Sequence, residues 1–214
     1  MKYEELRKQV VDTGVKMFKK ELTHGTSGNI SCRIPDEEKI LITPSSVPYL
    51  DIKTKDVLLV DFNGEALEGG RNPSVETPFH LAIYKKREDI GAIVHSHSVY
   101  ALAVAASGKT VPVFLDEMFS NIGGDLVVAK YELPGSDELA ESVLNRMEDK
   151  NVVLLANHGA VCCGKDLKDA FHVAETVEKI CRVFILSSIL DEVKPLPEDG
   201  IEYQKMMYEM YKDF

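Results

Sequence analysis

Two histidines one residue apart follow a short apolar run in GAIVHSHSVY, residues 91–100. On a strand, residues i and i+2 point to the same face, so His95 and His97 project together and can share one metal ion. A third histidine, His158, lies in LLANHGA, where an apolar strand runs into a glycine turn. Three histidines with one open position are typical of a catalytic Zn²⁺ site. The alternative is three hydrogen-bonded polar residues that only happen to lie at strand ends.

Glu76 is a candidate partner for these histidines. It falls in the first turn of a helix expected to begin near Ser74, where the helix dipole favours a carboxylate. The dipole alone would explain the residue, but near a metal it could also be a ligand or take a proton from a bound substrate. His24, in a polar loop, and His80 and His172, within helical patterns, are assigned no site.

Three turns rich in Ser, Thr and Gly are candidate anion sites, because their backbone N–H groups and hydroxyls can face a phosphate. They are GTSGNIS (25–31), TPSS (43–46) and NPSVE (72–76). Ser74 also precedes a helix N-terminus, which favours anions. Each turn alone is more often only a turn.

Helical and strand patterns alternate along the chain. Helices are expected at 2–21, from Ser74, and at 98–108, 136–149, 166–190 and 201–213, with Ser98 and Ser136 as N-caps. Strands are expected at 30–33, 39–43, 55–69 (a hairpin), 91–98, 111–119, 125–131 and 151–164 (strand, turn, strand). Because tight turns join several strands, we expect an α/β fold with a mixed or antiparallel sheet flanked by helices.

The composition indicates a cytoplasmic globular protein. The chain has 214 residues, is 44% hydrophobic and carries a net charge of −10, which argues against nucleic acid or an anionic membrane as partner. No apolar run reaches the roughly 20 residues of a membrane span. The cysteines are expected to be reduced and buried; they are Cys32, Cys162, Cys163 and Cys181. We expect one domain over 1–214, with 192–214 as a tail that could close the site.

Five segments in this order resemble the class II aldolase/adducin family: GTSGNIS, ILITPSSVPY, PSVETPFHLAIY, AIVHSHSVYALAVA and LLANHGAVCCG. The resemblance implies a three-layer α/β/α sandwich with a central, mainly antiparallel sheet, assembled as a homotetramer with sites at subunit interfaces. It implies Zn²⁺, or alternatively Mn²⁺ or Co²⁺, on His95, His97, His158 and Glu76. It also implies phosphate binding by Asn29, Ser45, Ser46 and Ser74, with Thr26, Ser27 and Gly28 in support.

The resemblance implies cleavage of a ketose 1-phosphate into dihydroxyacetone phosphate and an aldehyde, with Glu76 as acid/base. The substrate would be L-fuculose 1-phosphate or a related 5-deoxy or 5-substituted pentulose 1-phosphate. VFLDEMFSNIGG lacks the tyrosine acid that the sugar aldolases carry in this segment. DEMF instead resembles the HQEM segment of methylthioribulose-1-phosphate dehydratases, so Glu117 is the expected second acid/base, with an exposed loop carboxylate as the alternative. Tyr211 in the tail could contact the site, although helix packing would explain the tail aromatics equally well.

Other activities of the same fold are the alternatives: an epimerase, a methylthioribulose-1-phosphate dehydratase or a phosphosugar-acid decarboxylase. Glu76 favours the aldolase, because the dehydratases lack this glutamate and the epimerases usually carry Asp there. A non-catalytic adducin-like scaffold is less expected, since such members lose the metal residues. A second departure is Val75, which stands where many members carry another serine.

Overall fold

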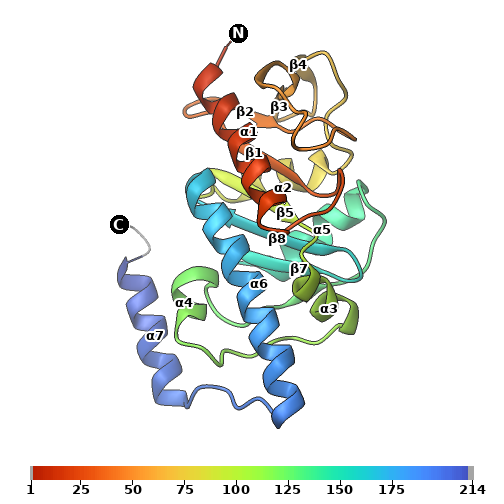
Figure 1. The fold of residues 1–214 in the computed structure, drawn as a ribbon. Coiled ribbons are helices and arrows are strands. Elements are labelled where there is room, and N and C mark those ends of the chain that lie inside the picture. Colours follow the sequence, from red (N-terminus) through yellow and green to blue (C-terminus); the bar gives the residue numbers. More distant parts are fainter. Residues whose placement is uncertain (1, 212–214) are drawn as a thin grey trace.

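A computed structural model describes residues 2–211, with the side chains of Glu209 and Tyr211 left out. In that part of the chain eight strands form one sheet, in the order β4-β3-β2-β1-β5-β8-β7-β6 (Figure 1). The strands are β1 (Asn29–Arg33), β2 (Lys39–Ile42), β3 (Leu58–Asp61), β4 (Ala66–Glu68), β5 (Ala92–Ser96), β6 (Val128–Ala129), β7 (Val152–Leu155) and β8 (Gly159–Gly164). All neighbours pair antiparallel except β6 and β7, so the expected mainly antiparallel sheet is confirmed.

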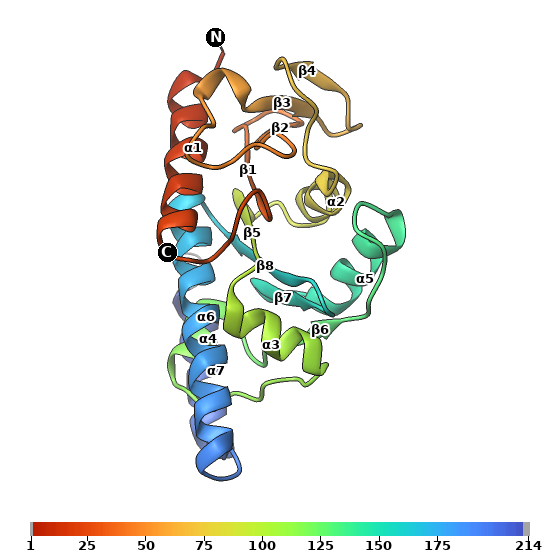
Figure 2. The ribbon, with the colours of Figure 1, turned by 45° about the vertical axis from the view of Figure 1, so that its right-hand side comes forward.

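Helices cover both faces of this sheet (Figure 2). They are α1 (Glu4–Lys19), α2 (Thr77–Lys86), α3 (Val99–Ser107), α4 (Glu117–Ile122), α5 (Asp137–Met147), α6 (Leu167–Leu190) and α7 (Glu198–Tyr211), with a 3₁₀ turn η1 (Thr54–Asp56). The core against α1, α3, α4 and α6 is separate from the core against α2 and α5, which makes the expected three layers. Among residues 2–211 no helix is long and apolar enough to cross a membrane.

The period of two along the strands divides side chains between the two cores. On β5, Val94 packs on the α6 side while Ile93 packs on the α2 side. Cys162 likewise packs in the core on the α6 side and Cys163 in the core on the α2 side, so the two adjacent thiols do not face each other. All four cysteines are free and buried, as expected. Burial raises the pKa of Cys163 to about 12, which keeps this thiol protonated.

One strand prediction was wrong, and another is confirmed over two residues only. In the first, Val111 makes an isolated bridge with Leu126, 112–116 form a loop and 117–119 begin α4, whereas 125–131 contributes the two-residue β6. Met118, Phe119 and Ile122 are buried, at a spacing that suits a helix better than a strand. Gly123 then ends α4 in the left-handed conformation, with φ at 84°. An apolar run this short does not distinguish the two structures by periodicity alone.

The two predicted serine caps differ in what they bond. Ser136 caps α5 as expected, since its hydroxyl accepts from the Leu139 N–H at 3.1 Å. Ser98 precedes α3, but its buried hydroxyl has no hydrogen-bond partner. The first N–H groups of α3 instead donate to the Glu178 carboxylate of α6, Tyr100 at 3.1 Å and Ala101 at 3.0 Å. A carboxylate from another helix therefore replaces the local cap.

We expect Ser136→Ala to lower the free energy of unfolding by about 1 kcal/mol, because α5 loses a cap that nothing else supplies. Ser98→Ala is the matched control: it removes a hydroxyl that makes no capping bond, so its urea midpoint should stay close to that of the parent. Urea unfolding followed by circular dichroism measures both. Equal losses in the two variants would contradict this account of the caps.

Candidate metal centre

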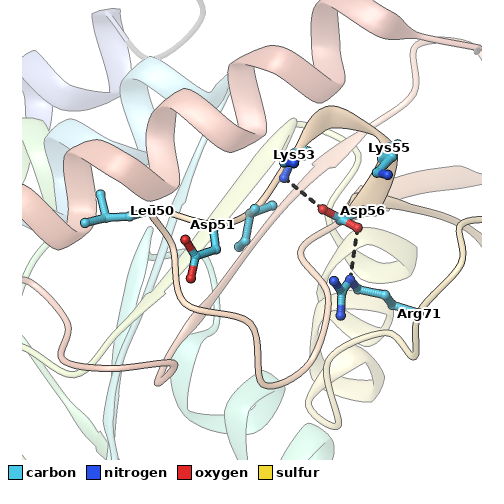
Figure 3. Close-up of a pocket in the computed structure, with 7 residues that line it drawn as sticks. Leu50, Asp51, Lys53, Lys55, Asp56 and Arg71 are labelled. Atoms are coloured by element: carbon cyan, nitrogen blue, oxygen red, sulfur yellow. Dashed lines mark hydrogen bonds and ion pairs between the residues drawn. The ribbon is translucent and has the colours of Figure 1, made fainter.

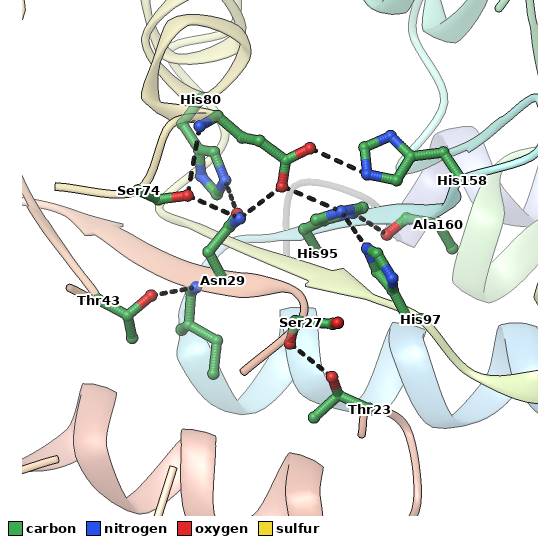
Figure 4. Close-up of polar contacts among 12 residues, drawn as sticks. Thr23, Ser27, Asn29, Thr43, Ser74, His80, His95, His97, His158 and Ala160 are labelled. Carbon is green, nitrogen blue, oxygen red and sulfur yellow. Dashed lines mark hydrogen bonds and ion pairs between the residues drawn. The ribbon is translucent and has the colours of Figure 1, made fainter. Parts of the chain in front are cut away.

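The candidate site lies where three strand ends and one helix start meet (Figure 4). β1 pairs with β5 so that Asn29 lies opposite His95, and opposed residues of an antiparallel pair share a face. His97 follows β5 directly, and His158 lies in the turn between β7 and β8. Glu76 is the residue immediately before α2, because this helix begins at Thr77, three residues later than expected, so Glu76 precedes the first turn instead of lying in it. The sheet register therefore gathers residues that are far apart in the sequence.

The four metal-ligand candidates contact one another through their polar atoms. His97 Nε2 lies 3.0 Å from His95 Nε2. The Glu76 carboxylate spans the other gaps, with Oε2 3.3 Å from His95 Nε2 and Oε1 3.0 Å from His158 Nε2. Donor atoms of the three histidines all lie within 4.8 Å of one another. Ligand atoms about 2.0–2.1 Å from a tetrahedral ion would be about 3.3 Å apart, so the cluster has the size of a metal site.

The backbone selects which nitrogen of His95 faces the cluster. His95 Nδ1 is 3.0 Å from the carbonyl oxygen of Ala160 on β8. A carbonyl can only accept, so Nδ1 carries the proton and the Nε2 lone pair points to Glu76 and His97. This is the arrangement in which a second hydrogen bond fixes a metal-binding tautomer.

Glycines let the backbones approach closely enough to form this cluster. Gly28 has a φ of +75°, and a Cβ there would lie 2.4 Å from the carbonyl oxygen of His95. A Cβ on Gly159 would lie 2.4 Å from the Ser96 carbonyl oxygen and 3.2 Å from the His97 ring. Side chains at either position would displace the HSH segment. Gly28, predicted as a phosphate-loop residue, thus also has a packing role.

Charges within the cluster shift the pKa values of its members. Burial would raise the pKa of Glu76, but the positive charges and close contacts of His95 and His158 outweigh it and hold this pKa well below the usual range. Burial likewise opposes the charge on His95, but Glu76 raises the pKa of that imidazole. Burial and the charge of His95 lower the pKa of His97 to about 3, so its ring is neutral and free to act as a ligand.

A divalent cation fits these residues. Glu76 Oε1 is buried without a hydrogen-bond partner, and its nearest described donor group is an imidazole of the same cluster. An ion among the three nitrogens and this oxygen would satisfy the carboxylate and accept the Nε2 lone pair of His95. Three imidazoles and one carboxylate suit Zn²⁺, and imidazole–carboxylate sets also take Mn²⁺ or Co²⁺.

The three predicted anion turns lie side by side. Asn29 Nδ2 is 2.9 Å from Ser74 Oγ, and an isolated bridge joins Pro44 to Pro73. The Ser45 N–H donates to the Asn72 carbonyl at 3.0 Å. Thr26, Ser27 and Ser46 are exposed around this junction, and Ser45 is half-buried. Sequence positions 26–29, 45–46 and 74 therefore converge beside the metal candidates.

Among residues 2–211, no acceptor is recorded for the hydroxyl proton of Ser74. Its Oγ accepts from Asn29 Nδ2 and, at 3.3 Å, from the Glu76 N–H. A serine hydroxyl donates once and accepts twice, so its donor remains available for an anion. Asn29, in contrast, uses both amide hydrogens internally, on Ser74 and on Glu76 Oε2 at 2.7 Å.

An ion pair anchors the segment that leads to Ser74 (Figure 3). Arg71 Nε lies 2.9 Å from Asp56 Oδ1, and the Lys53 N–H donates to Asp56 Oδ2 at 3.0 Å. Burial would raise the pKa of Asp56, but the bonds from Arg71 and the Lys53 N–H, together with the nearby positive charges, outweigh it and the pKa is lowered. The pair lines a surface hollow and fixes the loop before Glu76 to η1.

Glu117 is not brought to this cluster within the described part of the chain. It begins α4, and its carboxylate pairs with Lys179 of α6 at 2.8 Å. The tail helix α7 runs along α4, where Gln204 donates to Asp116 at 3.3 Å (Figure 1). The side chain of Tyr211 lies outside the described residues, so its predicted contact stays a prediction.

His80 belongs to the polar network of the site, although the sequence pattern assigned it to a helix alone. Its Nε2 lies 2.5 Å from Asn29 Oδ1, and Asn29 in turn bonds Glu76. The signal was present in the spacing, because Glu76 and His80 are four residues apart and so share one helix face. The spacing could not show that β1 places Asn29 between Glu76 and His80.

Comparisons with known proteins show which family the chain is similar to. Residues 8–185 match the family described as the class II aldolase and adducin N-terminal domain. A 5-deoxy-D-ribulose 1-phosphate aldolase of Bacillus thuringiensis serovar kurstaki is 38% identical over 205 residues, covering 96% of each chain. The L-fuculose phosphate aldolase of Escherichia coli is 33% identical over 203 residues, covering 94% of this chain and 93% of its own. A solved L-fuculose 1-phosphate aldolase structure superposes with a TM-score of 0.93 at 33% identity, covering 98% of both chains.

The chain therefore belongs to the class II aldolase and adducin family. The expected resemblance is confirmed, and so is the mixed α/β fold. The relatives named above are aldolases that act on phosphorylated sugars. The extent of the single domain over 1–214 and the roles of individual site residues stay predictions.

We expect His158→Ala to lower bound metal from about one ion per chain to a small fraction of that, because one of three imidazole ligands is lost. His24→Ala is the matched control, since His24 is an exposed histidine of the loop before Gly28. Elemental analysis after dialysis against Zn²⁺ measures both. Metal retention should also fall as the pH is lowered, because protons compete for His95 Nε2. Equal metal content in parent and His158→Ala would contradict the site.

Proposed function

We propose that this protein is a divalent-metal-dependent aldolase that cleaves a ketose 1-phosphate into dihydroxyacetone phosphate and an aldehyde. The substrate would be a 5-deoxy or 5-substituted pentulose 1-phosphate, or L-fuculose 1-phosphate. The observation that carries the proposal is the position of Glu76: a buried carboxylate that bridges two of three clustered imidazoles, with Oε2 3.3 Å from His95 Nε2 and Oε1 3.0 Å from His158 Nε2. The names of the relatives support the same substrate class.

A cation held by the three imidazoles would polarise the substrate carbonyl and stabilise the negative charge that develops there. The Ser74 hydroxyl would donate a hydrogen bond to the phosphate, and the exposed turns at 26–29 and 45–46 would surround it. Val75 is 66% exposed beside this turn, and its apolar side chain offers the phosphate no hydroxyl. Phosphate binding would thus depend on backbone N–H groups and neutral donors, consistent with an acidic chain.

Proton transfer needs two groups. In the cleavage direction one base takes the proton of the hydroxyl beside the breaking C–C bond, which becomes the aldehyde oxygen. The bonding electrons pass to the carbonyl side, and the carbon of the triose phosphate fragment gains a proton through Glu76, which takes that proton up from solvent, while the other base returns its proton to solvent. In the synthesis direction Glu76 removes that proton. Its Oε1, which faces the histidine cluster, is the atom suited to this exchange.

Glu117 is the proposed second acid/base, and it would act from a neighbouring copy. Within its own chain Glu117, on α4, is paired with Lys179, on α6. A homotetramer with sites between subunits, the assembly that the resemblance implies, would let α4 of one copy approach the histidines of the next. Zn²⁺ as the native ion and a cytoplasmic location belong to the same proposal.

Product analysis tests the activity. The Zn²⁺-loaded protein is incubated with L-fuculose 1-phosphate, 5-deoxyribulose 1-phosphate and methylthioribulose 1-phosphate, and dihydroxyacetone phosphate is measured with a coupled reductase. We expect release of triose phosphate together with the matching aldehyde. Epimer formation, loss of water or loss of CO₂ without triose phosphate would identify one of the alternative activities. Absence of any reaction in a metal-loaded protein would favour the adducin-like scaffold.

We expect Glu76→Gln to lower kcat by about 10²- to 10⁴-fold while the ion stays bound through the three histidines, because an amide cannot carry the proton. Steady-state kinetics and elemental analysis on the same preparation separate these two effects. Near-parental turnover with full metal content would exclude Glu76 as the acid/base.

Glu117→Gln should lower kcat with little change in KM, because the carboxylate acts on a reacting hydroxyl rather than in binding. Glu132→Gln is the matched control: it breaks a comparable ion pair, with Lys130 at 2.9 Å, and exposed pairs contribute only about 0–1 kcal/mol. If Glu117 acts across subunits, mixed oligomers of Glu76→Gln and Glu117→Gln chains should regain part of the activity. Parental kinetics in Glu117→Gln would show that Glu117 is an exposed carboxylate without a role in catalysis.

A further inference from the structure

A row of buried polar side chains continues away from Glu76 between β1 and α2. Asn29 and Ser31 are two residues apart on β1, so they share a face, while His80 and Tyr84 are four apart on α2. His80 lies between the two β1 residues, with Nε2 2.5 Å from Asn29 Oδ1 and Nδ1 2.7 Å from Ser31 Oγ. Ser31 Oγ in turn lies 2.8 Å from the Tyr84 hydroxyl.

The contacts of the Asn29 amide with Glu76 and Ser74 fix the direction of every hydrogen bond in this row. Glu76 Oε2 can only accept, so the group of Asn29 that faces it is the NH₂, and the Asn29 oxygen faces His80 (Figure 4). An amide oxygen also only accepts, so His80 Nε2 carries the ring proton and Nδ1 is an acceptor. Ser31 therefore donates to Nδ1, and Tyr84 donates to Ser31.

Because these side chains are buried, their hydrogen bonds cannot be exchanged for bonds to water. Ser31 and His80 are 0% exposed and Asn29 is 2% exposed, so solvent offers these groups no substitute partner. Burial and the charge of His95 lower the pKa of His80 to about 3, which keeps the ring neutral with a single proton. Burial raises the pKa of Tyr84 far above its usual value, which keeps the phenol a donor. Each group has one hydrogen-bonding choice that satisfies its neighbour.

We propose that His80, oriented by Ser31 and Tyr84, is a positioning residue for Glu76. By holding the Asn29 amide in one orientation, it keeps Glu76 Oε2 hydrogen-bonded and leaves Oε1 as the oxygen that serves the ion and the proton transfer. This inference rests on the proposed aldolase function for its kinetic consequence, but its hydrogen-bond content is independent of any activity.

The row also explains why one amide serves two site residues. Asn29 donates its two hydrogens to Ser74 Oγ and Glu76 Oε2. If the amide rotated, its oxygen would face the carboxylate at 2.7 Å, and both would be acceptors. His80 opposes that rotation, because its Nε2–H would then face an NH₂ group. Loss of the His80 donor should therefore affect the acid/base and the phosphate ligand together.

The kinetic test compares three variants of α2. His80→Phe removes the donor, and we expect kcat to fall by about 10- to 100-fold, the range typical of residues that orient a ligand, with metal content unchanged. His80→Gln can still direct an N–H at Asn29 and should recover most of that loss. Ile83→Val, a buried apolar change on the same helix, is the stability control and should leave kcat within about twofold.

A double-mutant cycle identifies the route of the effect. If His80 acts through Glu76, His80→Phe should cost little further turnover in a Glu76→Gln background. A merely structural role would give the same fold-loss in both backgrounds, and that result would overturn the proposal. So would parental kcat in a folded His80→Phe variant.

A spectroscopic test needs no activity. In the metal-free protein, ¹⁵N NMR of the imidazoles should show His80 as the neutral Nε2–H tautomer, and the Asn29 side-chain NH₂ signals should shift in His80→Phe but not in Ile83→Val. A protonated His80 or the Nδ1–H tautomer would overturn the proposal even if aldolase activity is found. The expected spectrum without any aldolase activity would keep the hydrogen-bond row and reject only the proposed function.

Discussion

The buried carboxylate of Glu76 is the group that most of the site is arranged around. Removing an ionised carboxylate from water costs several kcal/mol unless other groups replace its hydration. Here His95 and His158 lie within 3.3 Å of its two oxygens, and Asn29 donates to one of them. A divalent ion among the imidazoles would complete this replacement. The charge that makes Glu76 useful in proton transfer is the same charge that requires the cluster.

The antiparallel register of the sheet carries this arrangement. Pairing of Asn29 with His95, and of His95 with Val161, brings the start of β1, the end of β5 and the start of β8 to one place. Close backbone contact follows, which is why glycine occurs at 28 and 159. A side chain at either point would meet a carbonyl oxygen at 2.4 Å. Metal-site geometry and backbone packing are thus two consequences of one register.

Two sets of polar groups around Glu76 have different effects on it. The imidazoles set its charge, whereas Asn29 and His80 set which oxygen is free. Because the second group is held by Ser31 and Tyr84 in the sheet–helix interface, the orientation of the carboxylate is coupled to the packing of α2 on β1. That coupling connects stability and turnover at a position, His80, which contacts neither the proposed ion nor the substrate.

The sequence by itself determined the element types of the longer segments, the HSH pair, His158 and Glu76, because side-chain period and donor chemistry are local properties. It also located the three serine-rich turns. It misjudged 111–119, where a short apolar run was consistent with strand or helix until burial beneath α6 decided for α4. Only the tertiary structure decided the partners of His80 and the distance of Glu117 from its own histidines. Both depend on contacts between segments dozens of residues apart, and such contacts follow from strand register and helix packing, which no local pattern encodes.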